Sequence, residues 1–115
     1  MKKIRDIDRR WKWARGAKQV CFICGKPPGG WGKWLEVAHI IGGSGRSDEE
    51  CNLAFLCHTD HASTHGRQEI INGVKTPIRT RLDVLRGKKK FDPKNWNPGR
   101  LEELMGHKIP ELEQM

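Results

Sequence analysis

Four side chains of this 115-residue chain have the types and spacing of a metal site. Cys21 and Cys24 are separated by two residues and followed by Gly25, which relaxes the backbone so that both thiolates can reach one tetrahedral ion. Cys57 and Asp60 have the same spacing and supply a second ligand pair. Carboxylate oxygen is a less common zinc ligand than sulfur, but a legitimate one. We therefore predict a structural zinc site of three cysteines and one aspartate.

The cysteines also permit other arrangements. Two disulfide bonds would suit a secreted protein, but the chain begins with the charged run MKKIRDIDRR and not with an apolar signal segment. This favours a reducing compartment, where metal binding is the usual role of paired cysteines. If Asp60 is not the fourth ligand, His58 or Cys51 would complete the shell, although a small buried thiol is the commoner role for Cys51.

The residues between the ligand pairs predict the elements that position them. Residues 35–41 are apolar and β-branched, residues 42–50 are rich in turn formers, and residues 52–56 are apolar again. A polar, histidine-rich run follows. This order predicts strand, loop, strand and helix, which is a small ββα unit in an α+β fold. Three acidic residues of the loop are expected to be solvated: Asp48, Glu49 and Glu50.

Three short motifs occur in order within this unit: Glu36-Val-Ala-His39-Ile, Asn52-Leu and Cys57-x-x-Asp60-His61. The pattern resembles the HNH endonucleases, which are ββα-metal or His-Me finger nucleases, in the version that carries a zinc knuckle and is common in phage genomes. The three residues that give the family its name correspond to His39, Asn52 and His61. The resemblance covers about residues 21–66 and leaves both flanks unmatched.

The resemblance implies hydrolysis of DNA phosphodiester bonds that leaves 5′-phosphate and 3′-hydroxyl ends. His39 would be the general base, since an unperturbed imidazole titrates near neutral pH. Asn52 would brace the loop between the two strands. His61 and His65 are four residues apart, so on a helix both rings face one side and can share a catalytic divalent ion, Mg²⁺ or Mn²⁺.

Two positions depart from the family pattern, and one of them is Asp60, which stands where a fourth cysteine or a histidine is usual. The other precedes the base. The residue before the base is often an aspartate or histidine that ligates the catalytic metal, and here it is Ala38. Glu36 lies two residues earlier on the same face of the strand, so it is a candidate to replace that ligand, directly or through water. The commoner role of such a residue is that of an ordinary structural or solvated carboxylate.

Charge is unevenly distributed along the chain. The net charge is +8 for residues 1–34, −4 for residues 35–66 and +4 for residues 67–115. An acidic, histidine-rich centre between basic flanks is typical of a metal site that binds a polyanion. We therefore predict DNA as the partner, with a solvated basic face as the alternative. The candidate DNA contacts are Arg5, Arg9, Arg10, Arg46, Lys88, Lys89 and Lys90.

Both flanks are expected to be helical. A basic helix is predicted within residues 1–20, with Ile4, Ile7 and Trp11 on its apolar face. Three segments are assigned in the C-terminal extension: residues 68–71 continue or close the metal helix, residues 77–86 form a helix that Gly87 stops, and residues 100–105 form another.

These features predict one α+β domain over residues 1–115, made of the basic helix (1–20), the zinc knuckle with the ββα core (21–66) and a helical basic extension (67–115). The predicted function is a metal-dependent DNA endonuclease that nicks as a monomer, and double-strand cleavage would need a homodimer. The alternative is a non-catalytic zinc module that binds nucleic acid. No membrane span is expected. The expected location is the cytoplasm of a bacterium or a phage-infected cell, with phage packaging proteins as candidate partners.

Overall fold

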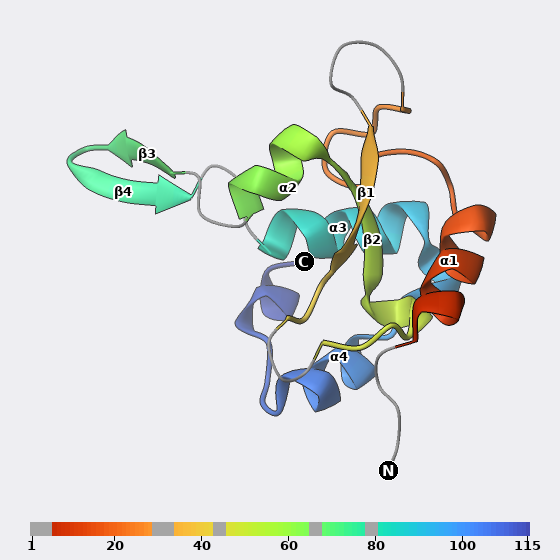
Figure 1. Cartoon of the computed structure of the whole chain (residues 1–115). Helices are drawn as coiled ribbons and strands as arrows, with labels where there is room; N and C mark the ends of the chain where they lie inside the picture. Colours follow the sequence, from red (N-terminus) through yellow and green to blue (C-terminus); the bar gives the residue numbers. More distant parts are fainter. Residues whose placement is uncertain (1–5, 29–33, 43–45, 65–67, 78–80) are drawn as a thin grey trace.

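A two-stranded antiparallel hairpin followed by a helix forms the centre of the protein. The computed structural model describes residues 6–28, 34–42, 46–64, 68–77 and 81–115. Strand β1 (Leu35–His39) pairs with β2 (Leu53–Cys57), with Leu35 opposite Cys57 and His39 opposite Leu53. Helix α2 (His58–Thr64) begins directly after β2 (Figure 1). The predicted strand, loop, strand and helix are therefore confirmed.

Helix α1 (Ile7–Gly16) packs beside β2. It begins at Asp6, whose side chain accepts a hydrogen bond from the Arg9 N–H, as is usual for a helix N-cap. The prediction that Ile7 and Trp11 form the packed apolar face of this helix is wrong, because Ile7 is 57% exposed and Trp11 is 50% exposed. Ile4, the third residue of the predicted face, lies outside the described residues. The helix buries Trp13 and Ala14 instead.

Aromatic side chains join α1, the knuckle and β2 into one core. The ring centroid of Trp13 lies 4.9 Å from that of Phe55, and Phe22 meets Phe55 edge-on at 6.2 Å. The backbone N–H of Phe22 also donates to the carbonyl oxygen of Phe55. The segment that carries the first two cysteines is thus fixed to the strand that carries the third.

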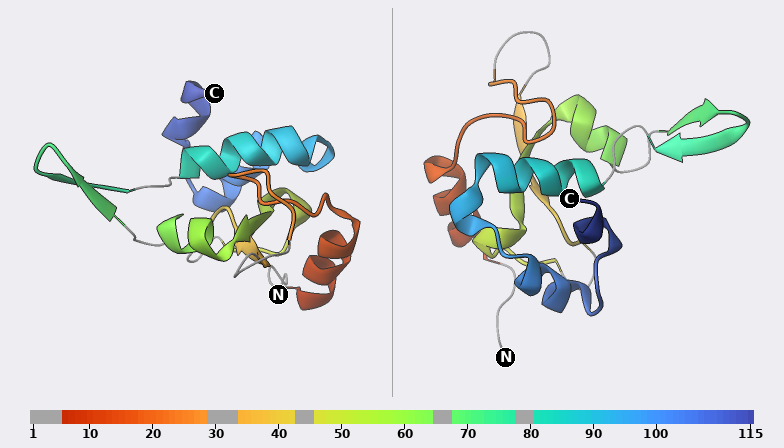
Figure 2. Two further views of the ribbon diagram at one scale, coloured as in Figure 1. Left: turned by 90° about the horizontal axis from the view of Figure 1, so that it is seen from above. Right: turned by 180° about the vertical axis from the view of Figure 1, so that it is seen from behind.

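Helix α3 (Arg81–Phe91) crosses the hairpin and packs closely on the knuckle (Figures 1 and 2). Gly87 lies inside this helix, so the prediction that it ends a helix is wrong. A Cβ atom at Gly87 would lie 1.7 Å from the Phe22 carbonyl oxygen. Glycine is therefore required here by close approach of the two backbones.

Lys88 is fully buried, which contradicts its predicted role as a DNA contact. Its ammonium group donates to the carbonyl oxygens of Glu50 and Leu53, at 2.6 and 2.7 Å, and to Asp92 at 2.6 Å. It also lies 4.9 Å from the ring centroid of Trp13. Lys88 therefore joins α3 to the start of β2, and only its neighbours Lys89 and Lys90 are exposed.

A second antiparallel hairpin replaces the helical continuation predicted for residues 68–71. Strands β3 (Gln68–Ile71) and β4 (Val74–Pro77) are joined by Asn72 and Gly73, which both have positive φ. These are the residue types that tight hairpin turns prefer. The hairpin projects from the body of the protein on the side opposite α1 (Figures 1 and 2).

The C-terminal part covers the lower end of the first hairpin. Helix α4 (Pro98–Met105), predicted over residues 100–105, has Asn97 as its N-cap and ends at Gly106 in the left-handed conformation. A 3₁₀ turn over Pro110–Gln114 then packs against α3. In the described part of the chain, no helix is long and apolar enough to cross a membrane.

Candidate functional site

Three cysteines and one aspartate come together as predicted. Cys21 and Cys24 lie on the knuckle, Cys57 ends β2, and Asp60 lies in the first turn of α2. Their ligand atoms all lie within 4.8 Å of one another, so the group could hold a metal ion such as zinc. His58 and Cys51, the two alternative ligands, are not part of this group.

The knuckle geometry explains how two cysteines converge. The Gly25 N–H donates to the Cys21 carbonyl oxygen, and the Cys21 N–H donates to that of Lys26. Gly25 has a φ of +75°, in the left-handed region where glycine is unstrained. The tight turn therefore depends on Gly25, as the sequence predicts.

Two thiols of the group, those of Cys21 and Cys57, have raised pKa values. Burial raises the pKa of Cys21 to about 12, and it also raises the pKa of Cys57. Both sulfurs lie 3.3 Å from Oδ2 of Asp60 and donate to it. A zinc ion would take the place of these protons, because it binds the thiolate form. The donor set thus fits a structural zinc ion.

His39 ends β1 and contacts a buried aspartate that the sequence analysis assigned to solvent. Its Nε2 lies 2.7 Å from Oδ1 of Asp48, and the two side chains are 11% and 0% exposed. Asp48 also accepts from the backbone N–H of Asp6 at 2.5 Å. Burial alone would raise the pKa of Asp48, but these hydrogen bonds outweigh it and lower the pKa. Asp48 is therefore an ionised, fixed partner of His39.

Asn52 braces the loop that connects the two strands. Its Nδ2 donates to the carbonyl oxygens of Ile41 and Ser47, at 3.1 and 3.0 Å, and its Oδ1 accepts from the Ile41 N–H at 2.7 Å. The side chain is fully buried. The bracing role predicted for Asn52 is therefore present, and it fixes the loop residue next to Asp48.

The other loop carboxylates are also paired and not solvated as predicted. Glu49 receives two hydrogen bonds from Arg100, at 2.8 and 2.6 Å. Glu50 receives hydrogen bonds from the Arg9 Nε, which lower its pKa. Arg9 is thus engaged within the protein, although it was predicted to contact DNA.

Glu36 and His61 lie side by side, as their proposed joint role requires. Nδ1 of His61 is 2.8 Å from Oε1 of Glu36, and Nδ1 of His58 is 3.3 Å from Oε2. Burial opposes ionisation of Glu36, but hydrogen bonds from His61, Trp34 and His58 lower its pKa overall. Such a carboxylate contact orients an imidazole ring.

The described residues offer few candidate ligands for the predicted catalytic metal. His65 lies outside the described residues, and Ala38 offers no ligand atom. Within the described ranges, the cysteine group is the only group of three or more side chains whose ligand atoms lie close enough to share an ion. Of the residues predicted to bind a catalytic ion, Glu36 and His61 are described, and their side chains are in contact.

His39 opens on a cavity of about 310 Å³ between β1 and the C-terminal part of the chain. The cavity is lined by Ala38, His39, Ile40, Gly42, Leu56, Thr64, Arg81, Val84 and Glu111. The position of Arg81 and Glu111 in this cavity was not predicted, because nothing in their local sequence indicates that they approach the hairpin.

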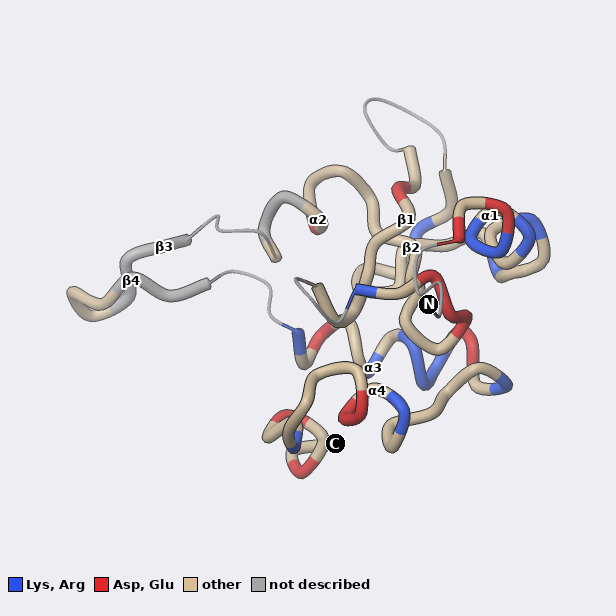
Figure 3. The backbone as a smooth tube through the Cα atoms, turned by 60° about the horizontal axis from the view of Figure 1, so that its bottom comes forward, with Lys and Arg blue, Asp and Glu red and all other residues tan. Residues whose placement is uncertain are grey.

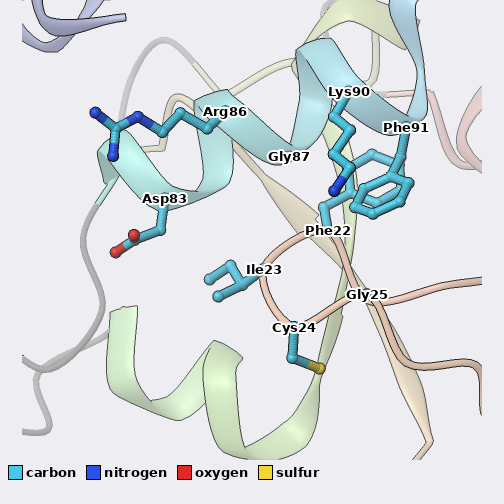
Figure 4. A pocket seen from close by; sticks show the side chains of 9 residues that line it. All are labelled: Phe22, Ile23, Cys24, Gly25, Asp83, Arg86, Gly87, Lys90 and Phe91. Atoms are coloured by element: carbon cyan, nitrogen blue, oxygen red, sulfur yellow. The ribbon is translucent and has the colours of Figure 1, made fainter.

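Lysine and arginine residues occur on several elements of the chain, among them α1, α3 and α4 (Figure 3). Arg46, Lys89 and Lys90 are exposed, whereas Arg5 lies outside the described residues. Arg10 is half-buried, with its guanidinium carbon 5.7 Å from the ring centroid of Trp11. Lys90, together with Arg86, borders a groove of about 240 Å³ between the knuckle and α3 (Figure 4).

The arrangement defines a small α+β protein with a β-hairpin, a following helix and a cysteine-rich group suited to a metal. Comparison with protein-family models, with curated proteins and with solved structures finds no match to this chain.

Proposed function

We propose that the protein is a metal-dependent HNH-type endonuclease that hydrolyses DNA phosphodiester bonds, with His39 as the general base. The observation that carries the proposal is the support of His39. Its ring is held by the buried Asp48, on a loop braced by Asn52, and it faces a cavity large enough for a phosphate group. A histidine used only for folding has no need of an open cavity.

The contacts of His39 assign a role to each ring nitrogen. An ionised Asp48 can only accept hydrogen bonds, so Nε2 of His39 would carry the proton and Nδ1 would be the basic atom. Nδ1 would take a proton from water as the water oxygen attacks phosphorus. The bond from phosphorus to the 3′ oxygen would then break, and that oxygen would take a proton from solvent water, to which His39 returns its own proton, which gives 5′-phosphate and 3′-hydroxyl ends.

The two metals would have different roles. The cysteine group would hold zinc and fix the knuckle against α2, as a structural site does. Glu36 and His61 would contribute to binding of Mg²⁺ or Mn²⁺. Such an ion polarises the phosphate and neutralises the leaving oxygen. A monomer has one such centre and would nick one strand, so a double-strand break would need a homodimer.

A non-catalytic zinc module that binds nucleic acid is the second candidate. Two observations favour it: Ala38 cannot ligate a metal, and the described residues contain no second three-ligand group. The exposed basic residues serve either function.

A plasmid relaxation assay separates the two functions. Protein stripped of metal and reloaded with zinc is tested with Mg²⁺ or Mn²⁺, beside His39→Ala and the control His107→Ala, whose ring is exposed and lies outside the cavity. The nuclease predicts open-circle DNA with the unchanged protein and the control, and none with His39→Ala. Binding of DNA without cleavage under any condition would support the binding module and refute the nuclease.

A further inference from the structure

An arginine in the cavity of His39 is bound by a carboxylate from the C-terminal turn. Nε and Nη2 of Arg81 lie 2.5 and 3.0 Å from the two carboxylate oxygens of Glu111. Both residues line the same cavity as His39. Their side chains are 27% and 21% exposed, so the pair can be reached by solvent.

The geometry of this pair is that of phosphate recognition. A guanidinium group binds a carboxylate and a phosphate through the same two parallel hydrogen bonds. Arg81 is the only lysine or arginine among the described residues that line the cavity. It therefore supplies the positive charge that a phosphate would require beside His39, and Glu111 cancels that charge in the free protein.

A second ion pair in the protein provides a contrast. Arg100 binds Glu49 through the same two nitrogens, at 2.8 and 2.6 Å, with side chains 27% and 18% exposed. That pair does not line the cavity of His39. The two pairs thus match in the guanidinium–carboxylate contact and in exposure; they differ in location and in a further contact of Arg100 with Glu103, at 2.9 Å.

We propose that Arg81 binds the scissile phosphate of the nucleic acid and that the Glu111 carboxylate occupies the place of that phosphate in the free protein. This inference rests on the proposed function. Hydrogen bonds from Arg81 lower the pKa of Glu111, so the carboxylate remains charged at neutral pH and competes with a phosphate. Partly exposed ion pairs contribute little to stability, so the substrate displaces Glu111 at small cost.

The test uses the dinucleotide TpT, which carries one phosphodiester, as the probe. Its affinity is measured by NMR from the Arg81 Nε–H and His39 ring signals in the full chain with zinc and without Mg²⁺ or Mn²⁺, so that the probe is not cleaved. Glu111→Gln is expected to tighten binding by up to roughly fivefold, the factor that a surface ion pair allows. Glu49→Gln is expected to leave the affinity for TpT unchanged. Arg81→Gln is expected to abolish binding, which in this variant is measured from the His39 ring signals alone.

Two of these variants also control for folding. Arg81→Gln and Glu111→Gln break the same ion pair, so a loss of stability would affect them alike, whereas the proposal predicts opposite effects on affinity. Equal affinity for TpT in Glu111→Gln, Glu49→Gln and the unchanged protein would overturn the proposal.

Cleavage distinguishes this inference from the nuclease proposal itself. Arg81→Gln is expected to slow single-turnover nicking by about 10²-fold, the usual effect of removing one group that stabilises transition-state charge. Nicking that needs His39 but proceeds normally in Arg81→Gln would refute the role of Arg81 and leave the nuclease intact. Binding of TpT through Arg81 without cleavage by the unchanged protein would refute the nuclease and leave the phosphate site.

Discussion

Replacement of Lys88 by methionine is expected to lower the free energy of unfolding by about 3–5 kcal/mol, the usual cost of removing one partner of a buried ion pair. Methionine has a similar length but no donor. It would leave Asp92, which is 6% exposed, as a buried charge without its cation. It would also leave the carbonyl oxygens of Glu50 and Leu53 without the Lys88 ammonium group.

Urea unfolding followed by tryptophan fluorescence measures this loss. For slopes of about 1–3 kcal/mol per molar urea, the midpoint falls by about 1 M or more. Lys89→Met is the matched control, because Lys89 is the exposed neighbour, and it should change the unfolding free energy by less than about 0.5 kcal/mol. Lys89→Met should instead weaken DNA binding, since it removes an exposed positive charge.

The double variant Lys88→Met/Asp92→Asn tests the physical cause. Removing both charges should recover part of the lost stability, because Trp13 and Asn95 still hydrogen-bond to residue 92. The reasoning fails if Lys88→Met unfolds at the same urea concentration as Lys89→Met. It also fails if the double variant is less stable than the single one.

Three further predictions follow from the site and its supports. Asp48→Asn should reduce nicking at least about tenfold with zinc content unchanged, because Asp48 orients His39, and plasmid assays at equal protein concentration would check this. Gly87→Ala should lower the free energy of unfolding, measured in urea, by about 1–3 kcal/mol or more, and the variant should lose zinc to a competing chelator more readily. Gly16→Ala should have neither effect, because the space around Gly16 is open. The protein should also lose stability in acid. The folded-state pKa values of four carboxyl groups are lowered, those of Glu36, Asp48, Glu50 and Glu111, so the unfolded chain binds protons more tightly than the folded protein. Their contribution to the free energy of unfolding should be present above about pH 4.5 and be lost as the pH drops further, and urea midpoints at pH 7, 5 and 3.5 would test this.

The parts of the site that depend on local spacing were predictable from the sequence. The cysteine pairs, the two strands and the following helix all have short-range signals, namely ligand spacing, β-branched runs and turn residues. The gathering of Cys21, Cys24, Cys57 and Asp60 follows directly once the hairpin is formed. Asn52 braces its loop through residues only five and eleven positions away.

The remaining contacts join residues that are distant in the sequence. Asp48 looks like a turn residue, and only the fold brings it between His39 and the backbone of Asp6. In the sequence, Lys88 cannot be distinguished from its neighbours Lys89 and Lys90. It is buried and they are exposed because helix α3 continues through Gly87 and places the Lys88 side chain on its buried face. Periodicity indicates a face but not its partner, so these roles required the structure.

The Lys88 contacts also have a consequence for the order in which the centre is completed during synthesis. The ribosome makes His39 and Asn52 before it makes Lys88 and Asp92, yet the start of β2 is clamped by the Lys88 ammonium group. At about 5–20 residues per second, the interval between Asn52 and Lys88 is on the order of seconds. A nascent chain therefore contains His39, Asn52 and His61 well before it contains Lys88. The Lys88 contacts that fix the start of β2 can form only after α3 has emerged from the ribosome.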